Sequence, residues 1–280
     1  MASDSRYTLA GVMGWPVGHS RSPIIHNHWI AEHGLRGAYV LLPVESAKLE
    51  QALRALPALG FSGCNLTIPH KVAALSIVDR VDLLAQRVGA INTVIVEPDG
   101  SLTGRNTDAF GFVQSLRDAQ PDWRPEVGPA LVLGAGGASR AVVAGLLDCG
   151  VPIVRLANRS ADKTHELINI FGAQVEAVEW SERHTALQGA ALLVNTTNLG
   201  MQGQPTLDLR LDHLHPTALV ADIIYAPLET PLLSEAKARG NHTVNGLGML
   251  LNQARPAFEA WFGVLPQLSQ PLLDKLHASF

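Results

Sequence analysis

The segment Asn65-Leu-Thr-Ile-Pro-His-Lys71 holds a residue suited to proton transfer, the amine of Lys71. It follows an apolar run, and Pro69 indicates that a helix starts here. A lysine in the first turn of a helix faces the positive end of the helix dipole, which disfavours the cation. An ordinary solvated lysine is the alternative. Further along, Asn106-Thr-Asp108 precedes an apolar helix, and Asp108 is most simply its N-cap or a first-turn acid.

Two hydroxyl side chains stand close to another helix start, in the segment His19-Ser-Arg-Ser-Pro23. Ser22 fits the N-cap and Pro23 the first position of the following helix. The same geometry has a second use, because Ser20, Ser22 and the N–H groups of a helix N-terminus can hold a carboxylate without a charged side chain. The sequence leaves capping and carboxylate binding both open.

A glycine-rich turn, Gly134-Ala-Gly-Gly-Ala-Ser139, follows an apolar strand and opens an apolar helix. Such a turn lets the backbone approach a pyrophosphate that lies on the helix N-terminus, so it predicts dinucleotide binding. Ser139 stands where the usual pattern has a third glycine. A purely structural turn is the alternative.

The end of the next strand carries positive charge where an NAD site would carry an acid. It reads Asn158-Arg-Ser160, and Lys163 follows. Arg159 and Lys163 suit a 2′-phosphate, which a carboxylate would repel, so we expect NADP rather than NAD. A solvated basic helix start is the alternative. Asp162 is interpreted as a first-turn acid that matches the dipole of the next helix.

Short apolar runs alternate with amphipathic stretches along the 280 residues, which is typical of α/β folds with mainly parallel sheets. At this length two domains are favoured. In the first third we expect strands and helices up to a hairpin turn at Asp99-Gly100. The expected strands are Thr8–Met13, Ala38–Val44, Gly63–Thr67 and Ile91–Glu97, and the helices lie near Ile24–His33, Ala47–Leu56 and Asp82–Val88.

From Ala130 the alternation restarts and predicts a doubly wound, Rossmann-like nucleotide fold. Asn245-Gly246 breaks this pattern. Two helices, about Leu247–Trp261 and Pro266–His277, are then expected to pack back on the first domain. We therefore expect an α/β protein with a first domain of residues 1–107 and 246–280, built on a mixed sheet, and an NADP-binding domain of residues 108–245.

Composition excludes several classes of protein. Hydrophobic residues make up 47% and charged residues 16% of the chain, which excludes disorder as its main state. The net charge of −4 and the lack of long basic runs argue against a nucleic-acid partner. The start MASDSRYTLA has no export-signal pattern, and no run of apolar residues is long enough to span a membrane, so we expect a cytoplasmic protein without a membrane partner.

Cysteine and histidine spacings give no sign of a disulfide or a metal site. Cys64 and Cys149 lie far apart and are expected to be buried small residues in a reducing compartment. The 11 histidines include the pairs His26-x-His28 and His213-x-His215. Because a spacing of two places side chains on different faces of a helix, and no carboxylate stands at ligand spacing, we expect surface histidines and no metal.

Taken together, these segments resemble the shikimate dehydrogenase family from Gly14 to about Pro266. Nine runs carry the resemblance in order: GWPVGHSRSP, NLTIPHK, GAINT, GRNTDAFGF, GAGGASRA, NRS, NTTNLGM, DIIYAPLETPLL and NGLGMLLNQA. The resemblance implies the reversible NADPH-dependent reduction of 3-dehydroshikimate to shikimate, a step towards chorismate and the aromatic amino acids. It implies a small-molecule substrate as the partner, and we expect a monomer or a homodimer.

The resemblance also implies that the first domain, residues 1–107 and 246–280, is the substrate-binding domain, and it implies roles for individual residues. Ser20 and Ser22 would bind the substrate carboxylate, Lys71 would be catalytic, and Asp108 would orient it. We expect the Lys71 ammonium to act as the acid in the reducing direction, with a mainly electrostatic role as the alternative. The ring substituents would be reached by Thr67, Asn92, Asp108, Tyr225 and Gln253. The cofactor would be lined by Gly134, Ala135, Gly136, Gly137, Ala138, Asn158, Arg159, Ser160, Lys163, Ile223 and Gly246.

The sequence departs from the family pattern at two positions. Leu66 replaces the more usual valine, and Lys163 stands where many members have arginine, whose forked group grips phosphate better. Three other functions are weighed. Arg159 argues against a quinate/shikimate dehydrogenase that prefers NAD, and Lys71 with Asp108 argues against a non-catalytic NADPH sensor. An aminoshikimate enzyme shares most of the motifs and stays open.

Overall fold

The computed structural model describes residues 7–279, which divide into two compact units. The first unit contains the residues up to 107 and from 253 onward, and the second contains residues 108–252. Residues 1–6, part of the stretch in which the sequence predicts no export signal, and residue 280 lie outside the described residues. Across residues 7–279 no helix is long and apolar enough to cross a membrane.

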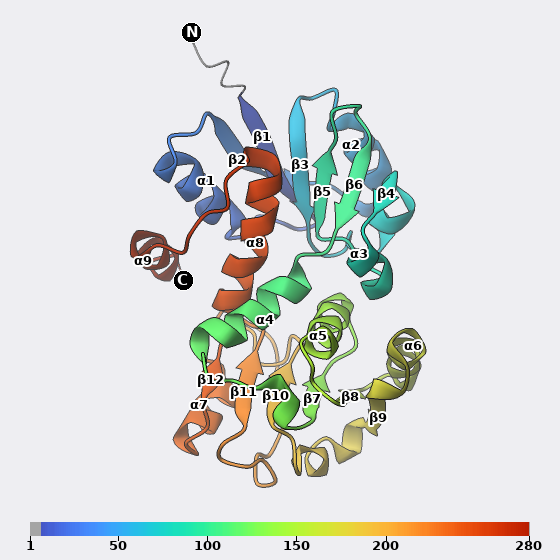
Figure 1. Ribbon diagram of the computed structural model, residues 1–280, viewed down its shortest axis with the longest axis vertical. Coiled ribbons are helices and arrows are strands. Elements are labelled where there is room, and N and C mark those ends of the chain that lie inside the picture. Colours follow the sequence, from blue (N-terminus) through green and yellow to red (C-terminus); the bar gives the residue numbers. More distant parts are fainter. Residues whose placement is uncertain (1–6, 280) are drawn as a thin grey trace. The chain divides into compact units, whose positions relative to one another are not determined.

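A mixed sheet forms the centre of the first unit (Figure 1). Its strands are β1 (Thr8–Gly14), β2 (Gly37–Pro43), β3 (Phe61–Leu66), β4 (Arg80–Val81), β5 (Thr93–Val96) and β6 (Leu102–Arg105). They lie in the order β2-β1-β3-β5-β6-β4. β1 is parallel to β2 and β3, whereas β5 is antiparallel to β3 and β6. The mixed sheet that the sequence predicts is confirmed.

Helices cover the sheet of the first unit. They are α1 (Ser22–Glu32), η1 (Ser46–Lys48), α2 (Leu49–Ala55), η2 (Ala73–Ser76), α3 (Leu83–Val88) and α9 (Gln270–His277). α1 packs on β1 and β2, and α9 packs on α1. Trp29 Nε1 donates to the Gln267 carbonyl at 3.2 Å, which fixes the chain just before α9. The last helix therefore packs back on the first unit, as expected.

A parallel sheet forms the centre of the second unit. Its strands are β7 (Ala130–Leu133), β8 (Val154–Asn158), β9 (Val175–Glu179), β10 (Leu192–Asn195), β11 (Leu219–Asp222) and β12 (Thr243–Val244). The order is β12-β11-β10-β7-β8-β9, and every strand pair is parallel. Counted from β7, this is the 3-2-1-4-5-6 order of a doubly wound nucleotide fold, so that prediction is confirmed.

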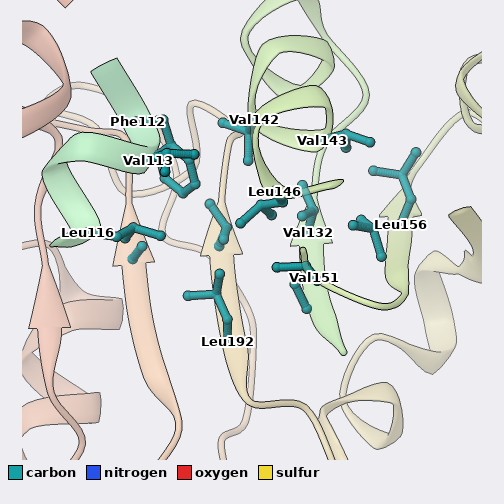
Figure 2. Close-up of a cluster of buried hydrophobic side chains, with 14 of the residues drawn as sticks. Phe112, Val113, Leu116, Val132, Val142, Val143, Leu146, Val151, Leu156 and Leu192 are labelled. Carbon is teal, nitrogen blue, oxygen red and sulfur yellow. The ribbon is translucent and has the colours of Figure 1, made fainter. Parts of the chain in front are cut away.

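Apolar side chains of two helices close one face of this parallel sheet. The helices of the second unit are α4 (Asp108–Ala119), η3 (Pro125–Val127), α5 (Gly137–Asp148), α6 (Ala161–Phe171), η4 (Gly172–Gln174), η5 (Trp180–Glu182), η6 (Thr185–Leu187) and α7 (Pro231–Ala238). Figure 2 shows Phe112 and Val113 of α4 and Leu146 of α5 directed towards the strands. Val132 of β7 is fully buried beneath them.

The second boundary between the units lies inside helix α8 (Gly246–Phe262), between Asn252 and Gln253, rather than at the predicted position before Gly246. Met249 belongs to the apolar core of the second unit, and Gly248 lies against Ser115 of α4. In contrast, Trp261 donates its indole N–H to the Val94 carbonyl of β5 at 3.1 Å. One continuous helix thus supplies both units, because Asn245-Gly246 marks the start of a helix and not a change of unit.

Candidate active site

Buried amide side chains connect the strand ends in the first unit. Asn65 at the end of β3 donates from Nδ2 to the Asn92 carbonyl and to Thr93 Oγ1, both at 3.1 Å. Asn92 donates in turn to Thr107 Oγ1 at 2.9 Å, and its Oδ1 accepts the Thr107 N–H at 2.8 Å. Because each amide has partners on both its nitrogen and its oxygen, the orientation of these side chains is fixed before any ligand arrives.

Gln253 joins this network from helix α8. Its Oε1 accepts a hydrogen bond of 3.3 Å from Asn92 Nδ2, and both side chains are buried. The structure thus brings together two of the residues that the resemblance assigns to the substrate ring, although 161 positions separate them in the chain.

The serine pair lies at the start of α1, but its capping differs from the expectation. Arg21 occupies the N-cap and Ser22 is the first helical residue, so the predicted N-cap role of Ser22 is wrong. The Ser22 N–H donates to Ser20 Oγ at 3.3 Å. The Ser22 hydroxyl, which is buried, pairs with the Tyr39 phenol. The serines therefore lie side by side, and the side chain of Ser22 does not cap the helix.

Tyr39 links the serine pair to the amide network. Its hydroxyl donates to Asn65 Oδ1 at 2.7 Å. Burial raises the pKa of Tyr39 well above its usual value, and the hydrogen bond from Ser22 acts in the opposite direction. Tyr39 and Asn65 are network members that sequence reasoning did not assign. Two features of the sequence could have indicated them. Tyr39 carries a polar hydroxyl in an otherwise apolar strand, and Asn65 is the first residue of the NLTIPHK run.

Lys71 lies in a turn that precedes the short helix η2, so its predicted place in the first turn of a helix is wrong. The helix begins only at Ala73, because the turn is held from outside. The Lys71 carbonyl accepts the Ile91 N–H at 2.8 Å, and His70 Nε2 contacts the Val44 carbonyl at 2.7 Å. Lys71 is half-buried. Its hydrogen bond to Ile91 places its backbone next to Asn92, which follows Ile91 in the chain.

Thr67 starts the turn that carries Lys71. Its N–H donates to the Met13 carbonyl of β1 at 3.0 Å, and its carbonyl accepts the His70 N–H at 2.9 Å. Thr67 and Lys71 therefore sit at two ends of one turn beside the amide network. Asp108 is the first residue of α4, as the first-turn interpretation predicts. It is buried and belongs to the second unit.

The glycine-rich turn of the second unit provides a cradle suited to a pyrophosphate. Gly134 has φ +107°, and a Cβ there would lie 2.7 Å from Thr196 Oγ1, so both conformation and space require glycine. At Gly136 and Gly137 a Cβ would meet no described atom within 4 Å. The N-cap of α5 is Gly136, which has no side chain to accept a hydrogen bond from the first N–H groups of the helix. The first N–H groups of α5 are thus accessible to an anion.

Ser139 explains how the turn does without its third glycine. The side chain is fully buried, and its hydroxyl donates to the Gly134 carbonyl at 2.5 Å. This hydrogen bond runs back across the turn and fixes its shape. Ala135 is buried and Ala138 is half-buried, so the alanines of the motif complete the turn and leave the glycine face open.

The basic segment follows β8, the neighbour of β7 in the sheet. Asn158 ends the strand, and its Nδ2 donates to the Ser160 carbonyl at 3.0 Å. Arg159, Ser160 and Lys163 are exposed, and Ser160 is the N-cap of α6. Since β7 and β8 are parallel neighbours, their carboxyl ends put the glycine turn and the basic segment on one edge of the sheet.

Ile223 and Gly246 also meet at the carboxyl edge. The Ile223 N–H donates to the Asn195 carbonyl at 3.1 Å, and the Gly246 N–H donates to the Ile224 carbonyl at 2.9 Å. A Cβ at Gly246 would collide with the Ile223 carbonyl, so only glycine permits this approach. Tyr225 follows in the same loop and is half-buried.

The histidine and cysteine positions give two corrections. His26 is fully buried and stacks on Tyr39 with ring centroids 4.0 Å apart, so its predicted surface location is wrong. Burial lowers the pKa of His26 to about 3. Among the described residues, no cluster of His, Cys, Asp and Glu could hold a metal ion. Cys64 is buried, and Cys149 is half-buried rather than buried; over residues 7–279 both are free thiols.

Known proteins resemble this chain over nearly its whole length. A family model described as the shikimate dehydrogenase substrate binding domain matches residues 12–94. A shikimate dehydrogenase (NADP(+)) of Paramagnetospirillum magneticum is 56% identical over 264 residues, which cover 94% of this chain and 96% of the relative. One of Rhodospirillum rubrum is 56% identical over 268 residues, with 94% and 95% covered.

A solved structure has the same fold. Shikimate 5-dehydrogenase from Thermus thermophilus, in complex with NADP(H) and shikimate, is 36% identical with a TM-score of 0.87. The match covers 98% of this chain and 100% of that one.

Proposed function

We propose that this chain, which belongs to the shikimate dehydrogenase family, catalyses the reversible NADPH-dependent reduction of 3-dehydroshikimate to shikimate. The observation that carries the proposal is the identity of 56% to a shikimate dehydrogenase (NADP(+)) across 94% of the chain. The enzyme is an NADP-dependent oxidoreductase of the shikimate pathway, which leads to chorismate and the aromatic amino acids.

Most of the substrate-binding residues in this proposal belong to the first unit. Ser20 and Ser22 hold the carboxylate, which is supported by their adjacent places at the start of α1. Hydroxyl groups can satisfy a carboxylate at low cost when a helix N-terminus supplies further donors. The ring substituents are bound by Thr67, Asn92, Asp108, Tyr225 and Gln253. The hydrogen bond between Asn92 and Gln253 supports this assignment, because a pre-oriented pair loses little entropy on binding.

Lys71 and Asp108 perform the proton chemistry. When bound, NADPH supplies the hydride that reduces the ketone carbon. The Lys71 ammonium donates a proton to the ketone oxygen, which thereby becomes the hydroxyl of shikimate, and it takes that proton back in the reverse direction. Asp108 orients the amine and the substrate hydroxyl. The turn that holds Lys71 is anchored by the bonds of His70 and Ile91, which suits a group that must stay in place.

The second unit binds the cofactor. Gly134, Ala135, Gly136, Gly137 and Ala138 hold the pyrophosphate at the N-terminus of α5, where the open glycine face leaves room for it. Arg159 and Lys163, with Asn158 and Ser160, bind the 2′-phosphate. Ile223 and Gly246 line the cofactor as well. Apart from Asp108 and Tyr225, these assignments place the substrate-binding role on residues 1–107 and 253–280 and the NADP-binding role on residues 108–252, which moves the proposed boundary from 245 to 252.

A steady-state assay with four combinations tests the proposal. The purified protein is assayed with shikimate and with quinate, each against NADP⁺ and NAD⁺. We expect the highest kcat/KM with shikimate and NADP⁺. Preference for quinate with NAD⁺ would assign the chain to a neighbouring activity, and so would turnover of an aminoshikimate alone in an added assay of that substrate. No turnover with any pair would contradict the proposal.

The cellular setting is part of the proposal. We infer a cytoplasmic enzyme that acts as a monomer or homodimer, with shikimate and 3-dehydroshikimate as its small-molecule partners and without a nucleic acid or a membrane. Light scattering coupled to size-exclusion chromatography gives the mass in solution, for which we expect once or twice the 29.9 kDa of the chain.

A further inference from the structure

One buried carboxylate of the second unit has no part in the chemistry proposed above. Asp222 ends strand β11 and is 2% exposed. Burial raises the pKa of its carboxyl group, and the hydrogen bonds of Ile224, Thr230 and Asn195 act in the opposite direction. A buried carboxylate costs free energy unless several donors satisfy it, so its surroundings need an explanation.

The carboxylate of Asp222 collects donors from separate segments. Oδ1 accepts from Asn195 Nδ2 and from the Ile224 N–H, both at 3.1 Å. Oδ2 accepts from Thr230 Oγ1 at 2.8 Å. Asn195 ends β10, whereas Ile224 and Thr230 lie after β11. Only an acceptor with two oxygens can satisfy all of these donors at once.

Asn195 connects Asp222 to the loop after β10 through its own hydrogen bonds. Its Oδ1 accepts the Thr197 N–H at 3.0 Å and the Thr197 hydroxyl at 2.7 Å. Its Nδ2 also donates to the Leu199 carbonyl at 3.2 Å. The preceding residue, Thr196, donates its hydroxyl to the Leu133 carbonyl at 2.7 Å, directly beside the glycine turn at Gly134. The loop after β10 is therefore fixed between Asp222 and the glycine turn.

Thr230 and Ile224 connect Asp222 to the loop after β11. Thr230 is the N-cap of α7, and its hydroxyl oxygen accepts the Leu233 N–H at 3.4 Å while it donates to Asp222. Ile224 lies between Ile223 and Tyr225, and its carbonyl accepts the Gly246 N–H at 2.9 Å. Both ends of the loop that carries Ile223 and Tyr225 are thus tied to one carboxylate.

We propose that Asp222 is a positioning residue for the cofactor: it holds the loops after β10 and β11 in the arrangement that binds NADP. The inference rests on the proposed function, because Ile223 and Gly246 are assigned to the cofactor there. Asp222 acts through these loops and need not touch the cofactor. Loss of its charge loosens both loops together, which weakens cofactor binding more than substrate binding.

The substitution Asp222→Asn tests the proposal with little change of shape. The amide nitrogen that replaces one oxygen then faces a donor, either the Thr230 hydroxyl or the pair of Asn195 and Ile224. We expect the Kd for NADP⁺, measured by calorimetric titration of the protein without substrate, to rise at least about tenfold, as the loss of one hydrogen bond to a charged acceptor predicts. The KM for shikimate at saturating NADP⁺ should rise less than the Kd for NADP⁺, because Tyr225 is the one residue on these loops that is assigned to the substrate.

A pair at Thr230 and a control at Asn241 separate positioning from general destabilisation. Thr230→Val removes the hydroxyl and should raise the Kd for NADP⁺, whereas Thr230→Ser retains it and should restore wild-type affinity. Asn241 donates to the carbonyls of His215, Pro216 and Ala218 at the opposite end of β11. Asn241→Ala should lower the melting temperature and leave the Kd for NADP⁺ unchanged.

The outcomes distinguish the inference from the proposed function. If Asp222→Asn and Thr230→Val fold and bind NADP⁺ as tightly as the wild type, the positioning role is wrong even though turnover of shikimate stands. If Asp222→Asn does not fold, the comparison of Thr230→Val with Thr230→Ser decides. An equal loss of affinity in Asn241→Ala would also overturn the inference. Wild-type protein that binds NADP⁺ but does not oxidise shikimate would contradict the proposed function alone.

Discussion

At the scale of the residue, Lys71 is the side chain on which the proposed proton transfer depends. Removal of a positioned acid–base group slows a reaction by about 10²–10⁴-fold, so Lys71→Ala should lower kcat at least about 100-fold and raise the KM for shikimate modestly. Steady-state rates with shikimate and NADP⁺ measure both constants. Lys48, an exposed lysine paired with Glu45 at 3.8 Å, supplies a control, because Lys48→Ala should leave kcat unchanged. A normal kcat in Lys71→Ala would remove this amine from the reaction.

In the proposed function, Arg159 is the residue that selects NADP over NAD. It is exposed directly after β8, where its guanidinium can pair with a 2′-phosphate. A lost hydrogen bond between charged groups costs about 1.5–3 kcal/mol, so Arg159→Ala should raise the KM for NADP⁺ about 10- to 100-fold. The KM for NAD⁺, which lacks that phosphate, should not rise. Arg124→Ala, at the exposed residue before η3, is the control. Equal effects on both cofactors would assign Arg159 a general role.

At the scale of the element, a substitution in the glycine turn should affect cofactor binding far more than it affects stability. Gly136 has φ −88° and ψ −173°, which any residue adopts, and a Cβ there would meet no described atom within 4 Å. Gly136→Ala should therefore change the free energy of unfolding by less than about 1 kcal/mol, because the lower entropy of the unfolded chain is offset by the poorer N-cap that alanine provides. The KM for NADP⁺ should rise about tenfold, since the methyl group occupies the space that the pyrophosphate needs. Urea denaturation and initial rates measure the two effects, and an unchanged KM would contradict the cradle.

Gly145 lies in the same helix, α5, and a substitution there should lower stability. A Cβ at this position would lie 3.0 Å from both the Ala109 carbonyl and Val113 Cγ2 of α4. Gly145→Val should push α4 and α5 apart and lower the free energy of unfolding by about 1–3 kcal/mol, as overpacking does. Urea denaturation followed by the fluorescence of Trp123, which packs on this core, reports the loss. Ala161→Val at the exposed start of α6 should cost much less.

The order of the elements could be predicted because apolar runs and glycine turns are local signals. ALVLG followed by Gly136 and Gly137 indicates a strand, a turn and a helix without knowledge of the rest of the chain. β4 and β12, of two residues each, carry no such signal and form by pairing with β6 and β11. The turn at Lys71 was predicted as a helix because its contacts come from Val44 and Ile91, which are distant in sequence.

The candidate site was predictable in part for the same reason. Family motifs indicate Asn92 and Gln253, but the bond that joins them depends on how α8 lies in the first unit. Tyr39 was missed since an aromatic residue in an apolar strand is usually core. Its contacts with Ser22 and Asn65 arise only when β2, α1 and β3 come together.

At the scale of the whole molecule, stability in acid depends on a histidine that the sequence placed on the surface. Burial lowers the pKa of His26 from 6.5 to about 3, whereas the unfolded chain keeps the ordinary value. Between these values the unfolded state binds the extra proton, so the free energy of unfolding falls as the pH drops below 6.5. The loss on going from pH 7.5 to pH 5 amounts to about 2 kcal/mol.

Replacement of His26 by an apolar ring should remove this dependence. Phe can stack on Tyr39 in the same place, and neither ring nitrogen of His26 has a hydrogen-bond partner among the described residues, so His26→Phe forfeits no bond. Urea denaturation at pH 7.5 and pH 5, followed by the fluorescence of Trp29 and Trp261, measures the difference for both proteins. The variant should lose about 2 kcal/mol less than the wild type over this interval, because the contributions of all other groups cancel in the comparison. If the free energy of unfolding fell equally in the two proteins, the pKa of His26 would be the same in the folded and unfolded states, and this histidine would not cause the loss of stability in acid.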